Sequence, residues 1–178
     1  MMPNWCNNTI IFDSDVEDNV QLINAFNWPE PFQIIRPCPQ DLLAEEAHCW
    51  GGENAKQQDL LREQLTKTYG YPNAYDWHVA NWGTKWDAHA IDCDGLTFYF
   101  DTAWAPPLAL YRYIAKNHPG ARFEFSYEEG GCDFAGEGYV RDGEFNDYDV
   151  PGSWSIEPKP SATSESVVIG SETRLRLP

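Results

Sequence analysis

The sequence predicts an α+β fold in which an antiparallel sheet carries helices on one face. Runs of apolar residues, several of which alternate with polar ones as in strands, occur at 9–12, 86–93, 96–104 and 122–127. Apolar residues at helical spacing occur at 15–27 and again after Pro106 and Pro107. With residues 28–84 set aside as an insertion, the order is βαββαβ, the ferredoxin-like split βαβ, followed by a C-terminal hairpin.

The first half of the chain holds one strand and the helical insertion. Residues 9–12 predict the first strand, and Ser14 with Glu17 has capping-box spacing, so a helix is expected at 15–27. Residues 32–35 predict a short β run between prolines. Helical turns are expected at 41–47, a second helix at 54–69 and a short helix at 73–82.

The second half is punctuated by two hairpin signals. Asp94-Gly95 joins the strands 86–93 and 96–104, and Asp142-Gly143 joins 139–140 to 144–145. In the strand 96–104, Phe98 and Phe100 share one face and Tyr99 takes the other. The helix after Pro107 ends at residues 118–120, and the glycine-rich stretch 128–138 predicts a solvated acidic loop.

The chain is expected to form one domain over 1–150, with the insertion at 28–84. Residues 151–178 are rich in Pro and Ser, which predicts a tail, with one edge strand expected at 167–169. At 178 residues and 20.3 kDa, one sizeable core is feasible. Eight Trp, nine Tyr and nine Phe exclude a disordered chain.

The excess of acidic over basic residues indicates which class of partner the protein can bind. There are 12 Lys and Arg against 28 Asp and Glu, which gives a net charge of −16. This balance opposes binding to nucleic-acid phosphates and to anionic membranes, because both need a basic surface. A basic protein is therefore the expected partner, with no membrane and no direct nucleic-acid binding.

The cysteine pattern indicates a reducing compartment. The five cysteines form no CxxC pair, and the N-terminus has no secretory pattern, so the cytoplasm with free thiols is expected. A zinc site from Cys38, His48 and Cys49 matches none of the usual ligand spacings. No metal or cofactor is therefore predicted.

Four motif blocks carry a family resemblance. They start at Met2 (MPNWCNNT), Trp82 (WGTKWDA), Phe100 (FDTAWAPP) and Tyr127 (YEEGGCDFAG). In this order the chain resembles the YubB-type ferredoxin-like domain family of phages and conjugative plasmids, over about residues 2–145. The resemblance implies a ferredoxin-like fold, a mobile-element origin and a bacterial host, and it supplies no catalytic residues.

Acidic residues concentrate in two clusters. Residues 124–149 contain nine acids against Arg141 alone, and Asp13, Asp15, Glu17 and Asp18 form a second cluster. If the first and last strands are neighbours near the sheet edge, both clusters converge on one side. The candidate partner-binding residues are Glu128, Glu129, Asp133, Glu137, Asp142 and Glu144, with Trp82 and Trp86 as aromatic anchors.

The two tryptophans also have a structural interpretation, which the residue pattern favours. Trp82 and Trp86 would close the core beneath the insertion, Gly83 would adopt a positive φ, and Lys85 with Asp87 would form a partly exposed pair.

The leading prediction is an acidic, non-enzymatic binding protein. It would act as a DNA mimic that occupies the basic site of a host nuclease complex, of the anti-CRISPR or anti-restriction type. The alternative is an accessory nucleic-acid-binding module that uses the aromatics 98–100. The third possibility is an enzyme with a cysteine or carboxylate centre, Cys132 or Glu129. For Cys132 the base would be His48, His78, His89 or His118, and no motif spacing selects a pair.

Overall fold

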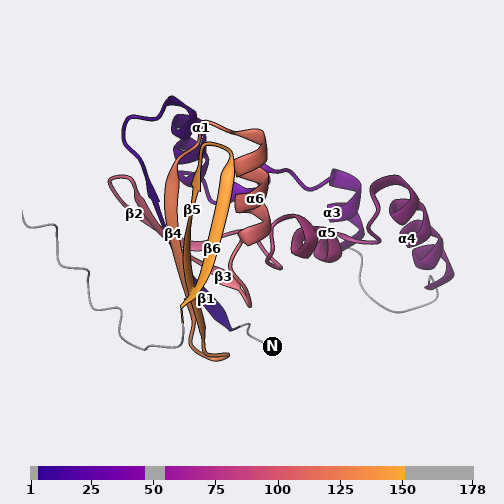
Figure 1. Ribbon diagram of the computed structural model, residues 1–178. Helices are drawn as coiled ribbons and strands as arrows, with labels where there is room; N and C mark the ends of the chain where they lie inside the picture. Colours follow the sequence, from indigo (N-terminus) through magenta and orange to yellow (C-terminus); the bar gives the residue numbers. More distant parts are fainter. Residues whose placement is uncertain (1–3, 47–54, 151–178) are drawn as a thin grey trace, which may run out of the picture.

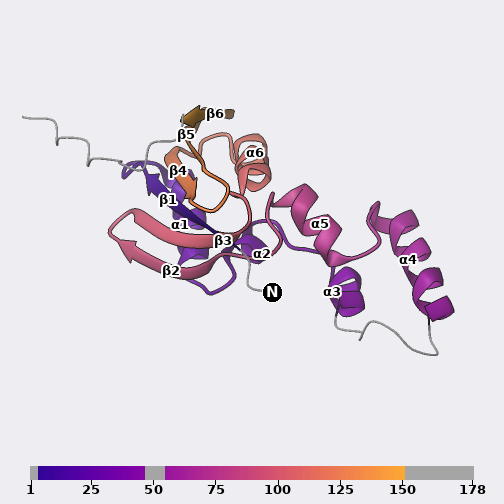
Figure 2. The same ribbon diagram turned by 90° about the horizontal axis from the view of Figure 1, so that it is seen from below.

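The computed structural model describes residues 4–46 and 55–150, in which one six-stranded antiparallel sheet carries α1 and α6 on one face (Figures 1 and 2). Its order is β2-β3-β1-β4-β5-β6. The strands are β1 (Trp5–Phe12), β2 (His89–Asp94), β3 (Thr97–Ala103), β4 (Phe123–Glu129), β5 (Phe134–Arg141) and β6 (Glu144–Val150).

The connections are those of two split βαβ units. α1 (Glu17–Phe26) follows β1, and α6 (Leu108–Asn117) links β3 to β4. β3 lies between β1 and β2, and β1 lies between β3 and β4, so each pair joined through a helix is split by a third strand. The predicted ferredoxin-like α+β fold is confirmed, and β5 and β6 extend the sheet beyond β4.

The core between sheet and helices is aromatic. Phe12 of β1 contacts Phe26 of α1 edge-on at 6.1 Å between ring centroids, and Tyr111 of α6 packs on Phe125 at 4.6 Å. Phe98 and Phe100 are buried while Tyr99 is exposed on the other face, as the alternation predicts. Aromatic pairs of this geometry stabilise a core beyond the area they bury.

α1 is anchored by a buried amide rather than by a capping box. The expected Ser14–Glu17 cap is wrong, because the helix is capped at Val16 without a side-chain hydrogen bond. Fully buried Asn19 instead donates to the Asp13 and Arg122 carbonyls at 3.0 and 2.7 Å and accepts from the Arg122 N–H. One side chain thus ties α1 to the end of β1 and the start of β4.

The described residues of the insertion form four helices: α2 (Pro31–Ile35), α3 (Gln40–Glu46), α4 (Ala55–Tyr69) and α5 (Ala74–Asn81). The β run expected at 32–35 is wrong, since these residues form α2. Pro31 occupies the first turn, where its missing N–H has no cost, and the Asp87 carboxylate accepts from the free N–H groups of Phe32 and Gln33. That acceptor comes from 54 or 55 positions along the chain, so no local pattern reveals it.

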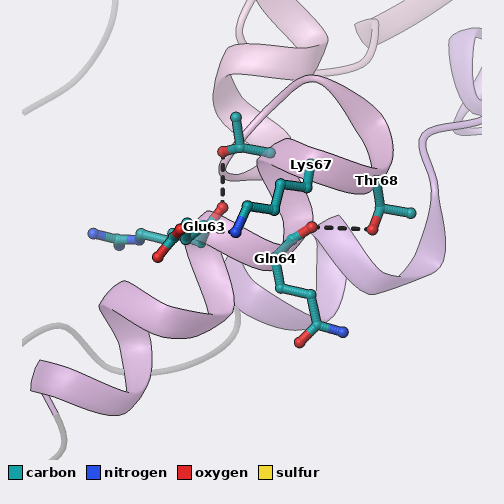
Figure 3. A network of polar contacts seen from close by, with 6 residues as sticks. Glu63, Gln64, Lys67 and Thr68 are labelled. Atoms are coloured by element: carbon teal, nitrogen blue, oxygen red, sulfur yellow. Dashed lines mark hydrogen bonds and ion pairs between the residues drawn. The ribbon is translucent and has the colours of Figure 1, made fainter.

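Helices α3, α4 and α5 project sideways from the sheet, with α4 farthest from it (Figures 1 and 2). The surface of α4 is largely polar: Lys67 pairs with Glu63 at 2.8 Å, and Thr68 donates to the Gln64 carbonyl (Figure 3). Leu65 is buried, and Tyr69 donates to Asp41 of α3 at 2.7 Å. The helices expected at 41–47, 54–69 and 73–82 are thus confirmed over the described residues.

The glycine-rich stretch is a strand rather than a loop. β5 begins at Phe134, so the loop expected over 128–138 is wrong outside the short turn 130–133. A Cβ on Gly136 would collide with the Tyr127 ring, and one on Gly138 with Phe125 and the Asn146 carbonyl. The glycines therefore make room for β4 rings that lie across β5.

Both hairpins are confirmed. β2 and β3 are joined at Gly95, and β5 and β6 at Asp142 and Gly143, whose φ values are 54° and 78°. Residues 151–178, including the strand expected at 167–169, and His48 with Cys49 lie outside the described residues. None of the described helices is long and apolar enough to cross a membrane.

Candidate functional site

The face of the sheet opposite α1 and α6 is the candidate site. Side chains alternate along each strand, and the buried positions of β1, β3 and β4 point toward the helices. The strand register aligns the remaining positions in rows. One row runs Asp94, Thr97, Ile11, Glu124, Tyr139 and Asn146; the next runs Asp92, Tyr99, Thr9, Ser126, Glu137 and Tyr148.

These rows make the open face strongly acidic. Together with the next row, which contains Asp101 and Glu128, the face carries the carboxylates of Asp92, Asp94, Asp101, Glu124, Glu128 and Glu137. Over these three rows the described residues contain no Lys or Arg; Arg141 stands at the hairpin end, 5.8 Å from the Tyr139 ring. We refer to this surface, defined by the six carboxylates, as the acidic face.

A hollow lies in the middle of the acidic face. It has a volume of about 400 Å³ and forms where the small side chains of Thr9 and Ser126 stand between larger ones. Glu124, Glu137, Tyr139 and Tyr148 also line it, as does Ile11. Glu137 is the diagonal neighbour of Glu124 across the β4–β5 ladder, which places the two residues about 7–8 Å apart. Two carboxylates and two phenol rings around a hollow can receive a basic side chain.

Of the eight residues singled out in the sequence, Glu128 and Glu137 lie on the acidic face. Glu144 is exposed at the start of β6, opposite Arg141 at the hairpin end. The register brings Glu128 and Glu137 together as diagonal neighbours, since Glu128 pairs with Ala135.

Glu129 and Asp133 belong to the β4–β5 turn. Glu129 is only 3% exposed, and its carboxylate accepts from the N–H groups of Gly131 and Cys132. Burial opposes ionisation of Glu129, but these donors lower its pKa. Asp133 adopts a φ of 55°. Glu129 therefore holds the turn closed, and its charge is not presented to solvent.

The two acidic clusters meet at one end of the sheet only. The first and last strands of the predicted βαββαβ order are β1 and β4, which pair as neighbours as expected, although β5 and β6 place both of them inside the sheet rather than at its edge. Asp13 donates its N–H to the Arg122 carbonyl at the start of β4, and Asp142 pairs there with the Arg122 guanidinium at 2.6 Å. The turn with Asp133 follows the opposite end of β4.

Trp82 is a core residue, as the structural interpretation expects. It is 2% exposed, donates its indole N–H to the Arg36 carbonyl at 2.9 Å and stacks on His78 at 4.0 Å. Gly83 has a φ of 95°, and a Cβ there would crowd the N-terminus of α6.

Trp86, in contrast, is 38% exposed, and the Lys85 ammonium lies 4.4 Å from its ring centroid. The expected Lys85–Asp87 pair is wrong, since Asp87 caps α2 and Lys85 lies over aromatic rings.

Cys132 is exposed and contacts Asn4 and Glu129. The hydrogen bond to Glu129 raises the pKa of the Cys132 thiol, which disfavours the thiolate that a nucleophile needs. Within residues 4–46 and 55–150, no cluster of three or more His, Cys, Asp or Glu side chains is arranged to hold a metal ion.

Four acids of the face were not among the candidate partner-binding residues, namely Asp92, Asp94, Asp101 and Glu124, although Glu124 belongs to the acidic cluster 124–149. Tyr139 and Tyr148 were not among these candidates either. The signal was present in the period-2 alternation, which places every second residue of a strand on the same face. It becomes usable only with the register, which shows that five strands align their acids and tyrosines.

One protein family and one solved structure are similar to this chain. Residues 81–159 match the model of the family described as the ferredoxin-like domain in Api92-like protein. The second half of the chain is therefore similar to that domain. Among solved structures, the crystal structure of a protein api92 from Yersinia pseudotuberculosis is 12% identical, with a TM-score of 0.44, over 85% of this chain and 99% of that chain. No curated protein matches the sequence. The origin on a phage or plasmid stays a prediction.

Proposed function

We propose that the protein is an acidic, non-enzymatic binding protein that presents the acidic face to a basic surface of another protein. The partner is a nucleic-acid-binding protein of a bacterial host, of the kind used in restriction or CRISPR-type defence. By occupying the basic site, the acidic face excludes nucleic acid from it. The family resemblance implies a phage or plasmid origin, and such an element benefits when a nuclease of its host is inhibited.

The observation that carries the proposal is the alignment of six carboxylates on a face that no described helix covers. Acids in a rigid sheet hold fixed spacings: Asp101 and Glu128 lie two strands apart, about 10 Å, and Glu137 lies about 7–8 Å from Glu128. Like charges so close repel one another, which costs stability in the free protein. A basic partner relieves this repulsion, so the face gains more from such a partner than dispersed charges would.

The hollow suggests how the partner is held. A Lys or Arg side chain that enters it places its aliphatic stem against Ile11 and the tyrosine rings. Its charged group then reaches Glu124 and Glu137. Binding through such contacts weakens with salt, because mobile ions screen the pairs that remain near solvent.

One observation favours the alternative, a nucleic-acid-binding module. Tyr99, Tyr139 and Tyr148 lie on the open face, where bases stack in other sheets of this kind. Each stands beside a carboxylate in the register: Tyr99 is opposite Asp92, Tyr139 opposite Glu124 and Tyr148 opposite Glu137. Because these charges repel phosphates, the tyrosines serve a basic protein partner better.

The test compares two proteins as bait in a lysate of the bacterial host. One is the natural chain and the other carries Glu124→Lys, Glu128→Lys and Glu137→Lys. The natural chain is expected to retain basic, nucleic-acid-binding proteins that the variant loses, and duplex DNA added to the lysate is expected to compete for them. Retention of the same proteins by both baits, or no competition by DNA, would contradict the proposal.

A matched control and a direct titration complete the design. Asp15→Lys, Asp59→Lys and Glu63→Lys change the net charge equally at exposed positions away from the acidic face. This control is expected to retain the same partners as the natural chain. Titration with single-stranded DNA at low salt is expected to leave the fluorescence of the natural chain unchanged, whereas strong quenching supports the alternative.

A further inference from the structure

A second cavity lies between the sheet and the insertion, away from the hollow of the acidic face. Its volume is about 540 Å³. Three indole rings line it, those of Trp5 from β1 and of Trp82 and Trp86 from the segment before β2. The imidazoles of His78 from α5 and His89 from β2 complete the aromatic wall.

His78 provides an acceptor that lacks a partner. The side chain is 6% exposed, and its Nδ1 lies 3.0 Å from the Lys85 carbonyl oxygen. A carbonyl only accepts, so Nδ1 carries the proton and Nε2 is a bare acceptor. Burial lowers the pKa of His78, which keeps the ring neutral. Nε2 is buried without a hydrogen-bond partner among the described residues, and such a group is costly to leave unpaired.

The charges around the cavity specify the sign of its ligand. The carboxylates of Glu30 and Asp87 line it, and among the described residues that line it there is no Lys or Arg, although the Lys85 ammonium lies against the Trp86 ring. The Asp87 oxygens accept from backbone N–H groups, while Glu30 is exposed at the rim. The cavity therefore offers acceptors and negative charge, which fits a cation that donates hydrogen bonds.

The indole rings specify the shape. Trp5 stacks on His89 with ring centroids 5.1 Å apart, and Trp86 stands 6.3 Å from Trp5 at a tilt of 48°. The Lys85 ammonium 4.4 Å from the Trp86 centroid shows that this ring accommodates a cation within the protein itself. A flat cation stacks on such rings better than a round one, and guanidinium is both flat and rich in N–H donors.

We propose that this cavity binds the guanidinium group of an arginine side chain in a polypeptide. One of its N–H groups donates to His78 Nε2 after displacing the atoms that cover this nitrogen, others donate to the carboxylates, and its plane packs on the face of the Trp86 ring that Lys85 leaves open. Free arginine is the weaker ligand, because its α-carboxylate is repelled by the Glu30 carboxylate at the rim. The site uses none of the six carboxylates of the acidic face. A negative result for arginine binding would therefore leave the proposed function untouched, and the reverse also holds.

The test is a titration of the full chain with Nα-acetyl-arginine amide. Calorimetry measures the affinity, and the ¹⁵N chemical shifts of the His78 ring report which ring nitrogen is contacted. The signal of Nε2 is expected to shift as an N–H donor arrives, since only that nitrogen is free to accept. Urea, which is flat and donates N–H groups without a charge, is expected to bind at least tenfold more weakly, and free arginine more weakly than the amide. Equal binding of urea, tighter binding of free arginine or an unmoved His78 signal would overturn the assignment.

Two variants locate the site without disturbing the core. Trp86→Ala and Glu30→Gln change exposed side chains and are each expected to weaken binding of the amide at least fivefold. Trp28→Ala removes a tryptophan outside the cavity that is more exposed than Trp86, 64% against 38%, and is expected to leave binding unchanged. Binding that survives Trp86→Ala, or that is lost equally with Trp28→Ala, would overturn the site.

Discussion

Asp87 holds the insertion against the sheet, so its removal tests how the two are joined. The carboxylate accepts from the N–H groups of Phe32, Gln33 and Ala88 at 3.0, 2.8 and 2.7 Å. Two of these donors open α2 and the third precedes β2. Asp87→Ala removes all three acceptor contacts, whereas Asp87→Asn keeps one acceptor oxygen and turns the other into a donor.

The expected cost follows from the number of donors left unpaired. A buried N–H without an acceptor costs about 1–3 kcal/mol, and water can replace part of this at a partly buried position. We therefore expect Asp87→Ala to lower the free energy of unfolding by about 3 kcal/mol in total. Asp87→Asn is expected to cost about 1–2 kcal/mol, because mainly the Gln33 contact is lost.

The pH dependence gives a second, independent signature. Burial raises the pKa of Asp87 from 3.8 to about 6, although its three N–H donors oppose the shift. The folded state therefore holds the proton more tightly than the unfolded state. Protonation of Asp87 therefore stabilises the folded state. This stabilisation is complete below the pKa that Asp87 has in the unfolded chain, and it is lost as the pH rises through 6. Between pH 7.5 and pH 4.5 this amounts to about 2 kcal/mol.

Urea denaturation of the natural chain and of Asp87→Asn at pH 7.5 and pH 4.5 measures this difference. The gap between the two proteins is expected to widen by about 2 kcal/mol at the lower pH, in favour of the natural chain. The comparison with Asp87→Asn removes the repulsion among the other acids, which both proteins share. A gap that stays constant or narrows on acidification would refute the reasoning about Asp87.

The remaining predictions concern buried contacts that stabilise the fold and the reactivity of the cysteine thiols. Asn19→Ala removes the three hydrogen bonds that tie α1 to Asp13 and Arg122, so we expect a loss of about 2–4 kcal/mol in urea denaturation; a loss below 1 kcal/mol would contradict the bridge. Gly138→Ala places a Cβ against the Asn146 carbonyl and the Phe125 ring, and we expect a melting temperature lower by about 10 °C or more; an unchanged value would refute the close approach. Under native conditions at pH 8, an alkylating reagent read by mass spectrometry is expected to modify exposed Cys93 and Cys132 and to spare buried Cys6 and Cys38. Glu129→Gln is expected to accelerate Cys132, because the Glu129 carboxylate raises the pKa of that thiol, and slower reaction would contradict the contact.

Local patterns predicted most elements of the fold but missed those set by distant contacts. Amphipathic spacing located α1, α4 and α6, and Asp-Gly pairs located both hairpins, because these signals act over a few residues. Residues 32–35 instead form α2, since Asp87 supplies the acceptor for its first N–H groups. Gly136 and Gly138 indicated a loop on their own, and only the Tyr127 and Phe125 rings that lie across them explain a strand there.

The sequence predicted that the candidate site is acidic, but it did not predict which acidic residues lie together on it. Counting acids along the chain pointed to residues 124–149, and three acids from that stretch, Glu124, Glu128 and Glu137, do lie on the acidic face. The same count could not separate them from Glu129, whose carboxylate holds a turn closed. Nor could it add Asp92 or Asp101, because their membership depends on the pairing of β2 and β3 with β1.

The central claim is that the acidic face, rather than overall acidity, binds the partner. The most direct measurement is the affinity of the basic protein recovered from the host lysate for three chains at two salt concentrations. These are the natural chain, the variant Glu124→Lys/Glu128→Lys/Glu137→Lys and the control Asp15→Lys/Asp59→Lys/Glu63→Lys. All three are first compared by melting temperature, which the substitutions at exposed face positions are expected not to lower.

We predict that the face variant binds more than tenfold more weakly than the natural chain, a loss above about 1.4 kcal/mol. The control is predicted to bind within about twofold of the natural chain, and higher salt is predicted to weaken binding of the natural chain far more than that of the face variant. Equal affinities for the face variant and the natural chain, or equal losses in the face variant and the control, would contradict the claim.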